Sequence, residues 1–278
     1  MTTITASEVN ELRKITGAGM MDCKKALQES NGDFETAIDY LRKKGQKISA
    51  NRADRDANEG AVIAITNDNN TVGVIVMLNC ETDFVAKNED FVAFANSITQ
   101  TALTNKPANT EALLNLTIEG TTIADAIQAY VAKIGEKISI GRYELVEGAN
   151  VVPYIHAGNR MGVLVSMNNA PNAANQVAGK DVAMQIAAMN PVAVDKDQVD
   201  ADTIKREIEI GKEQARAEGK PEDMLEKIAL GKLNKFYKES TLLEQSFVKD
   251  GSLSVAQMLE QVEKGLTVTA FKRIGLGQ

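Results

Sequence analysis

The side chains that most often carry acid–base or metal chemistry are scarce in this sequence. Among its 278 residues there is one histidine, His156, and there are two cysteines, Cys23 and Cys80. A histidine metal cluster needs several imidazoles, and a histidine-centred triad needs a nucleophile that no motif here supplies. The cysteines lack the spacing of zinc or redox motifs, which favours packing in a reducing compartment. We therefore predict that His156 is a polar surface or loop residue, with a partner contact as the alternative.

Loops that hold phosphate or calcium are also missing. Gly17-Ala18-Gly19 has no third glycine and follows no strand, so it predicts a helix break and not a dinucleotide loop. The Gly-Lys pairs are followed by Asp, Glu, Pro or Leu, where a phosphate-binding P-loop needs Ser or Thr. Asp54-x-Asp56-x-Asn58 begins like a calcium loop, but Glu59 and Ile65 stand where Gly and Glu are required. The sequence predicts no catalytic residue, metal site or cofactor, and therefore a protein that is not an enzyme.

One segment places an aromatic side chain beside an acid. Residues 80–88 (CETDFVAKN) follow an apolar strand and precede a helix. The spacing alone favours Phe84 folding into the core while Asp83 or Asn88 caps the helix, because most aromatic residues in loops are packed. The alternative is an exposed aromatic anchor that enters a pocket of another protein. A similar apolar strand later in the sequence is followed by Pro171-Asn172-Ala173 at the positions of Thr82-Asp83-Phe84. The fold therefore does not demand the side chains of residues 82–84, which favours the exposed anchor.

The elements that would position this segment follow from hydrophobic periodicity and from turn residues. Apolar residues at helical spacing predict three short helices in residues 1–45, and Thr5 with Glu8 forms a capping box for the first. Residues 46–58 are polar and have no apolar period, which predicts a linker. The next expected elements are strands over 60–66 and 71–80, helices from 88 and over 123–133, and strands within 137–147.

The second half of the sequence echoes the first. Residues 73–79 (GVIVMLN) resemble residues 162–168 (GVLVSMN), and each run precedes a loop and a helix, which predicts two related strand-and-helix subdomains. Residues 200–218 and 221–239 are highly charged, have narrow apolar seams and are joined by a Gly-Lys-Pro turn. They predict an antiparallel helical hairpin that projects into solvent. A helix over 254–263 and a strand over 267–274 are expected to follow.

The predicted fold is therefore α+β, with several parts in sequence. They are a three-helix bundle over 1–45, a linker over 46–58, core subdomain 1 over 59–147, the first part of core subdomain 2 over 148–199, a helical hairpin insertion over 200–239, and the remainder of core subdomain 2 with a short C-terminal module over 240–278.

Composition and charge exclude several classes of partner. Lys and Arg number 31 against 38 Asp and Glu, for a net charge of −7, and aromatic residues make up 4%. Proteins that bind nucleic acid use clustered cations and stacking aromatics, so no direct nucleic-acid partner is expected. No apolar run approaches the length of a membrane span, and the N-terminus carries acids that signal and transit peptides lack. A cytoplasmic protein without a membrane partner is predicted.

Four segments of the sequence resemble the bacterial translation elongation factor Ts family. Residues 12–27 (LRKITGAGMMDCKKAL) resemble the opening of that family, and residues 80–87 (CETDFVAK) are similar to its second hallmark, at the expected distance. Residues 132–136 (AKIGE) and 156–165 (HAGNRMGVLV) also match. The resemblance spans the whole chain.

The resemblance implies a nucleotide exchange factor for the GTPase elongation factor Tu. Members of the family have a UBA-like N-terminal bundle, a core of two related subdomains, a projecting coiled-coil hairpin and a short C-terminal module. The family's exchange loop corresponds here to Thr82, Asp83, Phe84 and Val85. In the family this loop intrudes between helices of the GTPase near its nucleotide and dislodges Mg²⁺.

Further contacts of the family map onto other positions of this sequence. They correspond to Lys24 in the N-terminal bundle, to Ile134 and Gly135, and to His156. A C-terminal Phe-Val-Met contact segment corresponds to residues 247–249, which places Val248 at a contact and a lysine, Lys249, where the family has methionine. The complex with elongation factor Tu is either one-to-one or a two-plus-two assembly.

Two other functions compete with nucleotide exchange. The first is a non-catalytic module whose UBA-like bundle recruits a different protein. Removal of residues 1–45 would abolish the function of such a recruiter, whereas an exchange factor would keep its core loop. The second is an enzyme that works with carboxylates alone, which would turn over its substrate without any GTPase.

Overall fold

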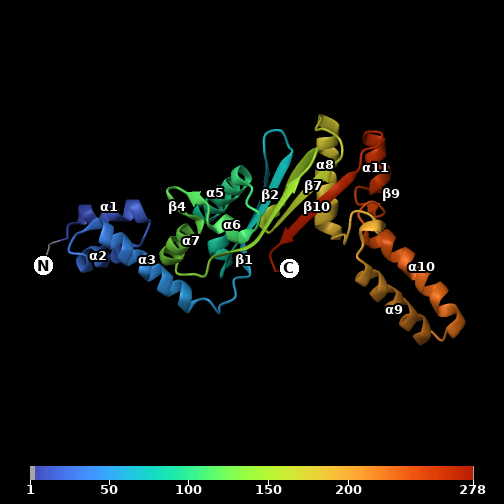
Figure 1. Ribbon diagram of the computed structural model, residues 1–278, viewed down its shortest axis with the longest axis horizontal. Helices are drawn as coiled ribbons and strands as arrows, with labels where there is room; N and C mark the ends of the chain where they lie inside the picture. Colours follow the sequence, from blue (N-terminus) through green and yellow to red (C-terminus); the bar gives the residue numbers. More distant parts are fainter. Residues whose placement is uncertain (1–3, 278) are drawn as a thin grey trace.

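The helices and strands follow one another along an elongated molecule. A computed structural model describes residues 4–277. The N-terminal helices lie at one end, the β-sheets occupy the middle, and a pair of long helices projects at the other end (Figure 1). The molecule thus has the α+β composition that the sequence predicted.

The first three helices pack together around an apolar core of their own. Helix α1 (Ala6–Thr16) begins at the predicted capping box, in which Thr5 and Glu8 bond each other's backbone, and it ends at Gly17, whose φ is 65°. Helices α2 (Met20–Glu29) and α3 (Phe34–Asn51) complete the group. The three predicted helices are therefore confirmed. Their core consists of Val9, Leu12, Ala18, Cys23, Ala26, Leu27, Ala37 and Leu41.

Helix α3 is longer than the sequence predicted. It continues six residues into the segment 46–58, so the prediction of a linker was wrong for that part. The reason is tertiary packing of α3 against α7 (Ile123–Ile134). The two helices approach so closely at Gly45 that a Cβ there would lie 2.8 Å from the Gln128 carbonyl oxygen. Ile48 also packs onto the core beyond. These contacts stabilise a helical end that has no apolar period.

The first sheet holds three antiparallel strands in the order β1-β2-β5. Strands β1 (Glu59–Thr66) and β2 (Val72–Cys80) form a hairpin, and β5 (Ser139–Glu147) pairs with the other edge of β2. The segment between β2 and β5 returns over one face of this sheet. It contains α4 (Asp83–Ala86), α5 (Glu89–Asn105), α6 (Thr110–Leu114), β3 (Thr117–Ile118), β4 (Thr121–Thr122) and α7.

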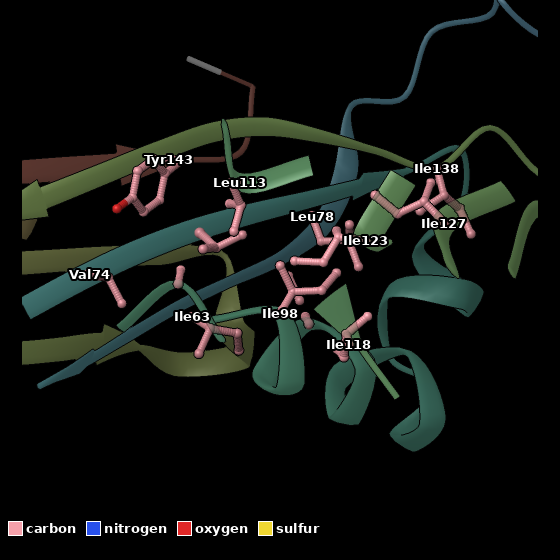
Figure 2. Packing of buried hydrophobic residues seen from close by; sticks show 14 of the residues in the cluster. Ile63, Val74, Leu78, Ile98, Leu113, Ile118, Ile123, Ile127, Ile138 and Tyr143 are labelled. Atoms are coloured by element: carbon pink, nitrogen blue, oxygen red, sulfur yellow. The ribbon is translucent and has the colours of Figure 1, made fainter. Parts of the chain in front are cut away.

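The main apolar core lies between the first sheet and these helices. Figure 2 shows Leu78 of β2 packed among Ile98 of α5, Ile123 of α7 and Ile118 of the small β3–β4 hairpin. Phe91, near the start of α5, is fully buried in the same core. The end of β2 and the start of α5 are thus fixed, and only the short segment between them reaches the surface.

The second sheet repeats the topology of the first. Its strand order is β10-β7-β6, formed by β6 (Asn150–His156), β7 (Met161–Met167) and β10 (Val268–Gly275). Each unit consists of a hairpin, a loop and helix after its second strand, a small two-stranded hairpin, another helix and a third strand beside the second. The remaining elements are η1 (Ala157–Asn159), α8 (Ala173–Met189), η2 (Lys196–Gln198), β8 (Ser246–Phe247), β9 (Asp250–Ser254) and α11 (Val255–Val262).

The C-terminal strand belongs to the second sheet. β10 pairs with β7 from Val268 to Gly275, and Val268 and Ile274 are buried. Helix α11 packs against α8 and places Leu259 in the core of the second unit. Residues 246–275 therefore complete the second unit, and the separate C-terminal module that was predicted is not formed by them. Their apolar residues are buried in the core of the second unit and, at Ile274, in the layer between the two sheets.

The two sheets pack face to face through a reciprocal pair of glycines. A Cβ on Gly73 of β2 would lie 2.9 Å from Leu164 of β7, and a Cβ on Gly162 of β7 would lie 3.6 Å from Ile75 of β2. Leu164 and Ile75 occupy matching positions of the repeated sequence. Each sheet thus provides a gap for the other's side chain, and these positions form a shared apolar layer. The layer consists of Val62, Ala64, Ile75, Val146, Val151, Leu164 and Ile274.

The projecting pair of helices is inserted into the second unit. Helices α9 (Ala201–Ala217) and α10 (Glu222–Ser240) run antiparallel, reverse at Gly219, and project from the sheets (Figure 1). The segments before α9 and after α10 lie side by side. Ala193 forms a β-bridge with Thr241, and backbone hydrogen bonds join the residues next to them. The predicted helical hairpin is confirmed, and it has a closed stem.

Two glycines of the hairpin are expected to respond in opposite ways to alanine. Gly231 of α10 has open space where a methyl group would lie, so Gly231→Ala should stabilise the hairpin by about 0.5–1 kcal/mol through helix propensity. A Cβ on Gly211 would lie 3.1 Å from the Ala229 Cα, so Gly211→Ala should destabilise it by separating the helices. Urea unfolding followed by circular dichroism measures both changes. Equal changes in the free energy of unfolding for the two variants would contradict the close contact between the helices at Gly211.

Candidate protein-docking site

The segment predicted to carry function is a single helical turn between β2 and α5. Thr82 precedes the turn, and its Oγ1 accepts a hydrogen bond from the Val85 N–H at 3.4 Å. Asn88 follows the turn and caps α5, accepting from the N–H groups of Asp90 at 2.8 Å and Phe91 at 3.3 Å. Of the two caps predicted for this helix, Asp83 or Asn88, the structure contains the one at Asn88. Side-chain caps at both ends define the conformation of a turn too short to be stable alone.

Phe84 points away from the protein. It is 84% exposed, so the interpretation in which it folds into the core was wrong. The neighbouring apolar positions explain this: Phe91 fills the core below, and Val85 packs partly buried against it. One turn of helix can direct only one side toward the core, and Val85 occupies that side. Phe84 is consequently an aromatic side chain presented to solvent on a fixed turn.

Asp83 lies on the exposed rim of the turn. Its carboxylate bonds the Lys87 ammonium at 2.6 Å, and this bond lowers the pKa of Asp83. Asp83 is thus ionised at neutral pH. Arg160, which follows β6 and η1, bonds Glu59 at 2.6 Å, and that bond raises its pKa with a smaller contribution from Asp83. Arg160 therefore lies within electrostatic range of Asp83, the residue before Phe84.

A carboxylate from a distant part of the chain holds the start of the turn. The side chain of Glu136 accepts three hydrogen bonds: from the Glu81 N–H at 3.1 Å, from the Thr82 N–H at 3.0 Å and from the Thr82 hydroxyl at 2.6 Å. Glu136 lies 54 residues beyond Thr82, directly after the glycine that ends α7. The family resemblance includes Glu136 in the motif over 132–136 but gives it no role. Its contact with Thr82 could not be predicted from the sequence, because no local pattern marks a contact between residues so far apart.

The carboxylate of Glu81 makes the converse contact. It accepts the Lys137 N–H at 2.6 Å and bonds the Arg52 guanidinium at 2.8 Å. Burial would raise the pKa of Glu81, but the Lys137 N–H and the Arg52 charge outweigh it, so the pKa is lowered. Arg55 adds a longer ion pair at 3.4 Å. Glu81 is therefore charged and connects the end of α3 to the turn.

Cys80 lies beneath the turn. It is fully buried, and its thiol donates to the Thr82 carbonyl oxygen at 3.2 Å. Burial, with the nearby charges of Glu136 and Glu59, raises the pKa of Cys80 to about 12. A thiol with such a pKa is an inert packing group while the turn stays closed.

Two of the other predicted contact residues, Ile134 and Gly135, lie close to the turn, and His156 lies at the end of a strand of the second sheet. Ile134 ends α7, and Gly135 terminates it with a φ of 80°, immediately before the Glu136 carboxylate that binds Thr82. His156 is exposed at the end of β6, where its Nδ1 lies 3.0 Å from the Tyr154 hydroxyl. The following residues, η1, contact β1. The prediction that His156 is a polar surface residue is confirmed.

The two remaining predicted contacts lie on other parts of the molecule. Lys24 is exposed on α2 of the N-terminal bundle. Val248 is 49% exposed in the turn between β8 and β9 of the second unit, where its N–H donates to Gln185. Beside it, Lys249 pairs with Asp181 at 2.7 Å. These residues do not join the turn at Phe84, so any partner that touches all of them has to extend along the protein.

Residues 4–277 contain neither a cluster of metal-binding side chains nor a helix that could span a membrane. No group of three or more His, Cys, Asp or Glu side chains there is arranged to hold a metal ion. No helix of this region has the length and apolar character needed to cross a bilayer. Cys23 and Cys80 are both free thiols and both buried.

Comparison with known proteins identifies the family. A family model described as Elongation factor TS matches residues 81–278. The chain is 57% identical to elongation factor Ts of Cytophaga hutchinsonii, over 99% of this chain and all of that protein. It is 53% identical to elongation factor Ts of Flavobacterium psychrophilum over the full length of both, and 49% identical to that of Porphyromonas gingivalis over 98% of both.

These matches extend well beyond the short segments in which the resemblance was first found. They include the N-terminal bundle, both sheets and the inserted hairpin, because the relatives align from end to end with this chain. The exposed turn at Phe84 and the carboxylate that holds it lie inside the region that the family model matches. The prediction made from the motifs is confirmed, and the chain belongs to the elongation factor Ts family.

Proposed function

We propose that this protein is a guanine-nucleotide exchange factor for the translational GTPase elongation factor Tu. The observation that carries the proposal is the exposure of Phe84 on a turn whose backbone is held from several sides. Aromatic side chains held rigidly at a surface are frequent centres of binding energy in protein interfaces, and Phe84 is 84% exposed.

The chemistry of exchange suits the residues at the site. An exchange factor forms and breaks no covalent bond, so it needs no general base and is not an enzyme in the usual sense. It binds the nucleotide-free GTPase more tightly than the loaded form, and by thermodynamic linkage nucleotide and factor weaken each other's binding equally. Mg²⁺ bridges the phosphate oxygens of a bound nucleotide, so its loss from the GTPase weakens nucleotide binding sharply.

Within this proposal the residues of the turn have separate roles. Phe84 enters between helices of the GTPase near its nucleotide site, and the displacement of those helices dislodges Mg²⁺. Asp83, ionised and exposed beside it, disturbs polar contacts there. Val85 packs on the protein's own core and Thr82 is bound by Glu136, so both act mainly by holding the turn.

The other predicted contacts extend the docking surface. Ile134 and Gly135 adjoin the residue that binds the turn, and together with His156 they would enlarge the contact around Phe84. Lys24 on the bundle, which we propose is UBA-like, and Val248 on the second unit would contact more distant parts of the GTPase. The helical hairpin would add a contact that affects exchange less than the turn does. We propose that the two sheet-containing units are related core subdomains, and that the complexes form singly or in a two-plus-two assembly.

Release of a fluorescent GDP analogue from elongation factor Tu tests the proposal. Addition of this protein should speed release by about 100-fold, near the upper end of the 5- to 150-fold changes in affinity that coupling free energies between two ligands commonly produce. A well-folded protein that leaves the rate unchanged would overturn the proposal and favour recruitment of another partner by the N-terminal bundle. Because translation elongation takes place in the cytoplasm, the proposed activity places the protein there.

A further inference from the structure

We propose that Glu136 is a positioning residue that holds the turn at Phe84 in its docking conformation before any partner binds. The inference rests on the proposed function, since it concerns how the docking turn is prepared. Its basis is the convergence of three donors on one carboxylate: the N–H groups of Glu81 and Thr82 and the Thr82 hydroxyl, at 3.1, 3.0 and 2.6 Å. Hydrogen bonds to an ionised acceptor are about twice as strong as neutral ones.

The contact is reciprocal, which makes it a clamp between two segments. Glu136 binds the backbone of residues 81–82, while Glu81 binds the backbone N–H of Lys137 at 2.6 Å. Each segment therefore supplies a carboxylate to the backbone of the other. Arg52 bonds both oxygens of Glu81 at 2.8 Å and supplies a positive charge beside the two acids. The start of the turn is fixed to the end of α7 by four hydrogen bonds that do not involve Phe84.

The clamp determines where Phe84 points. Thr82 Oγ1 donates to Glu136 and accepts from the Val85 N–H, so one hydroxyl joins the clamp to the first bond of the helical turn. Phe84 itself is too exposed to be oriented by packing. A single helical turn without such caps does not persist in water. Loss of the clamp should lower the population of the docking conformation, and the apparent affinity falls by the same fraction.

Measurement of GDP release against the concentration of this protein separates positioning from direct contact. For Glu136→Ala we expect the half-saturating concentration to rise about tenfold or more, with a plateau rate within about twofold of the wild type. For Glu136→Gln the half-saturating concentration should stay within about threefold of the wild-type value. Its amide oxygen can accept both N–H groups, while its amide nitrogen donates to the Thr82 hydroxyl oxygen. The matched control is Glu147→Ala. Glu147 is an exposed residue of β5 that pairs with Lys106, and its loss should change neither the half-saturating concentration nor the plateau rate.

Alkylation of Cys80 gives a second readout that needs no GTPase. With its pKa raised from 9.0 to about 12, its thiolate at pH 8 is roughly 10³-fold rarer than that of an ordinary thiol. The thiol also donates to the Thr82 carbonyl, so it reports whether the turn is closed. In a Cys23→Ala background, iodoacetamide should modify Cys80 about tenfold faster in Glu136→Ala than in Glu136→Gln, because both variants remove the charge that raises the Cys80 pKa and only the glutamine keeps the hydrogen bonds to the turn. Glu147→Ala should match the wild type.

Each outcome decides the matter. The clamp is overturned if Glu136→Ala keeps the wild-type half-saturation and is alkylated no faster than Glu136→Gln, or if only its plateau falls, since a lower plateau indicates a direct role in the complex. If Glu136→Ala does not fold, Thr82→Val replaces it: this variant removes one donor at similar volume and should shift both readouts two- to fivefold. If the wild type fails to release GDP, the proposed function fails, and the alkylation rates alone test the clamp.

Discussion

Truncation of Phe84 to alanine is expected to slow the release of GDP from elongation factor Tu by about 30- to 100-fold. Full burial of a phenylalanine side chain on docking is worth about 2–3 kcal/mol, and each 1.4 kcal/mol corresponds to a factor of ten. The fold should be unaffected, because a side chain that is 84% exposed contributes little to the core. Stopped-flow release of a fluorescent GDP analogue at subsaturating protein measures the rate.

A second phenylalanine provides the matched control. Phe91 lies seven residues later and is fully buried between the first sheet and its helices. Phe91→Ala should lower the free energy of unfolding by about 3–5 kcal/mol, whereas Phe84→Ala should leave the melting curve unchanged within error. Circular dichroism melts compare the two. The docking role would be refuted by a Phe84→Ala protein that melts like Phe91→Ala, or by one that releases GDP at the wild-type rate.

A methyl group at Gly73 is expected to destabilise the contact between the two sheets by about 1–3 kcal/mol. The added Cβ would lie 2.7 Å from the Val151 Cγ1 and 2.9 Å from the Leu164 Cδ2, so buried side chains or backbone have to shift. Gly162→Ala is the milder partner, because its nearest contact is Val62 at 3.0 Å and the others lie at 3.4 Å or more. Denaturant unfolding should therefore give a lower free energy of unfolding for Gly73→Ala than for Gly162→Ala.

A double-mutant cycle with Leu164 tests whether the crowding is the cause. Leu164 is fully buried, so Leu164→Ala alone should cost about 2–5 kcal/mol. The cavity it leaves gives room for the Gly73 methyl, and the double variant should be more stable than the sum of the single changes by about 0.5–3 kcal/mol. Strict additivity would mean that the methyl at Gly73 meets something other than Leu164.

Local sequence signals predicted the secondary structure well where the cause is local. The capping box at Thr5, the cap at Asn88 and the reversal near Gly219 each depend on residues within four positions of one another, and the structure contains all three. The helical hairpin was also predictable, since its charge pattern and its turn residues lie within it. Such features require no knowledge of distant contacts.

Features set by distant contacts could not be predicted. The helical end of α3 depends on α7, some 80 residues later, and its own residues carry no apolar period. The exposure of Phe84 depends on Val85 and Phe91 occupying the core first. Glu136 is similar: only the folded chain brings its carboxylate to Thr82. The repeat was detectable over seven residues, although the topology repeats throughout, because packing constrains strand order more strongly than side-chain identity.

The closed stem of the helical hairpin has a consequence for the entropic cost of forming the second sheet. The pairing of β7 with β10 joins residues that are distant in sequence; beside it, for example, the Thr269 hydroxyl donates to the carbonyl oxygen of Ser166, 103 positions away. The hairpin forms from local contacts, and its stem at Ala193 and Thr241 then removes a long stretch from that loop. Halving a loop lowers its closure cost by about 0.6 kcal/mol. Once the hairpin is formed, its closed stem therefore lowers the entropic cost of bringing the last strand to the second sheet.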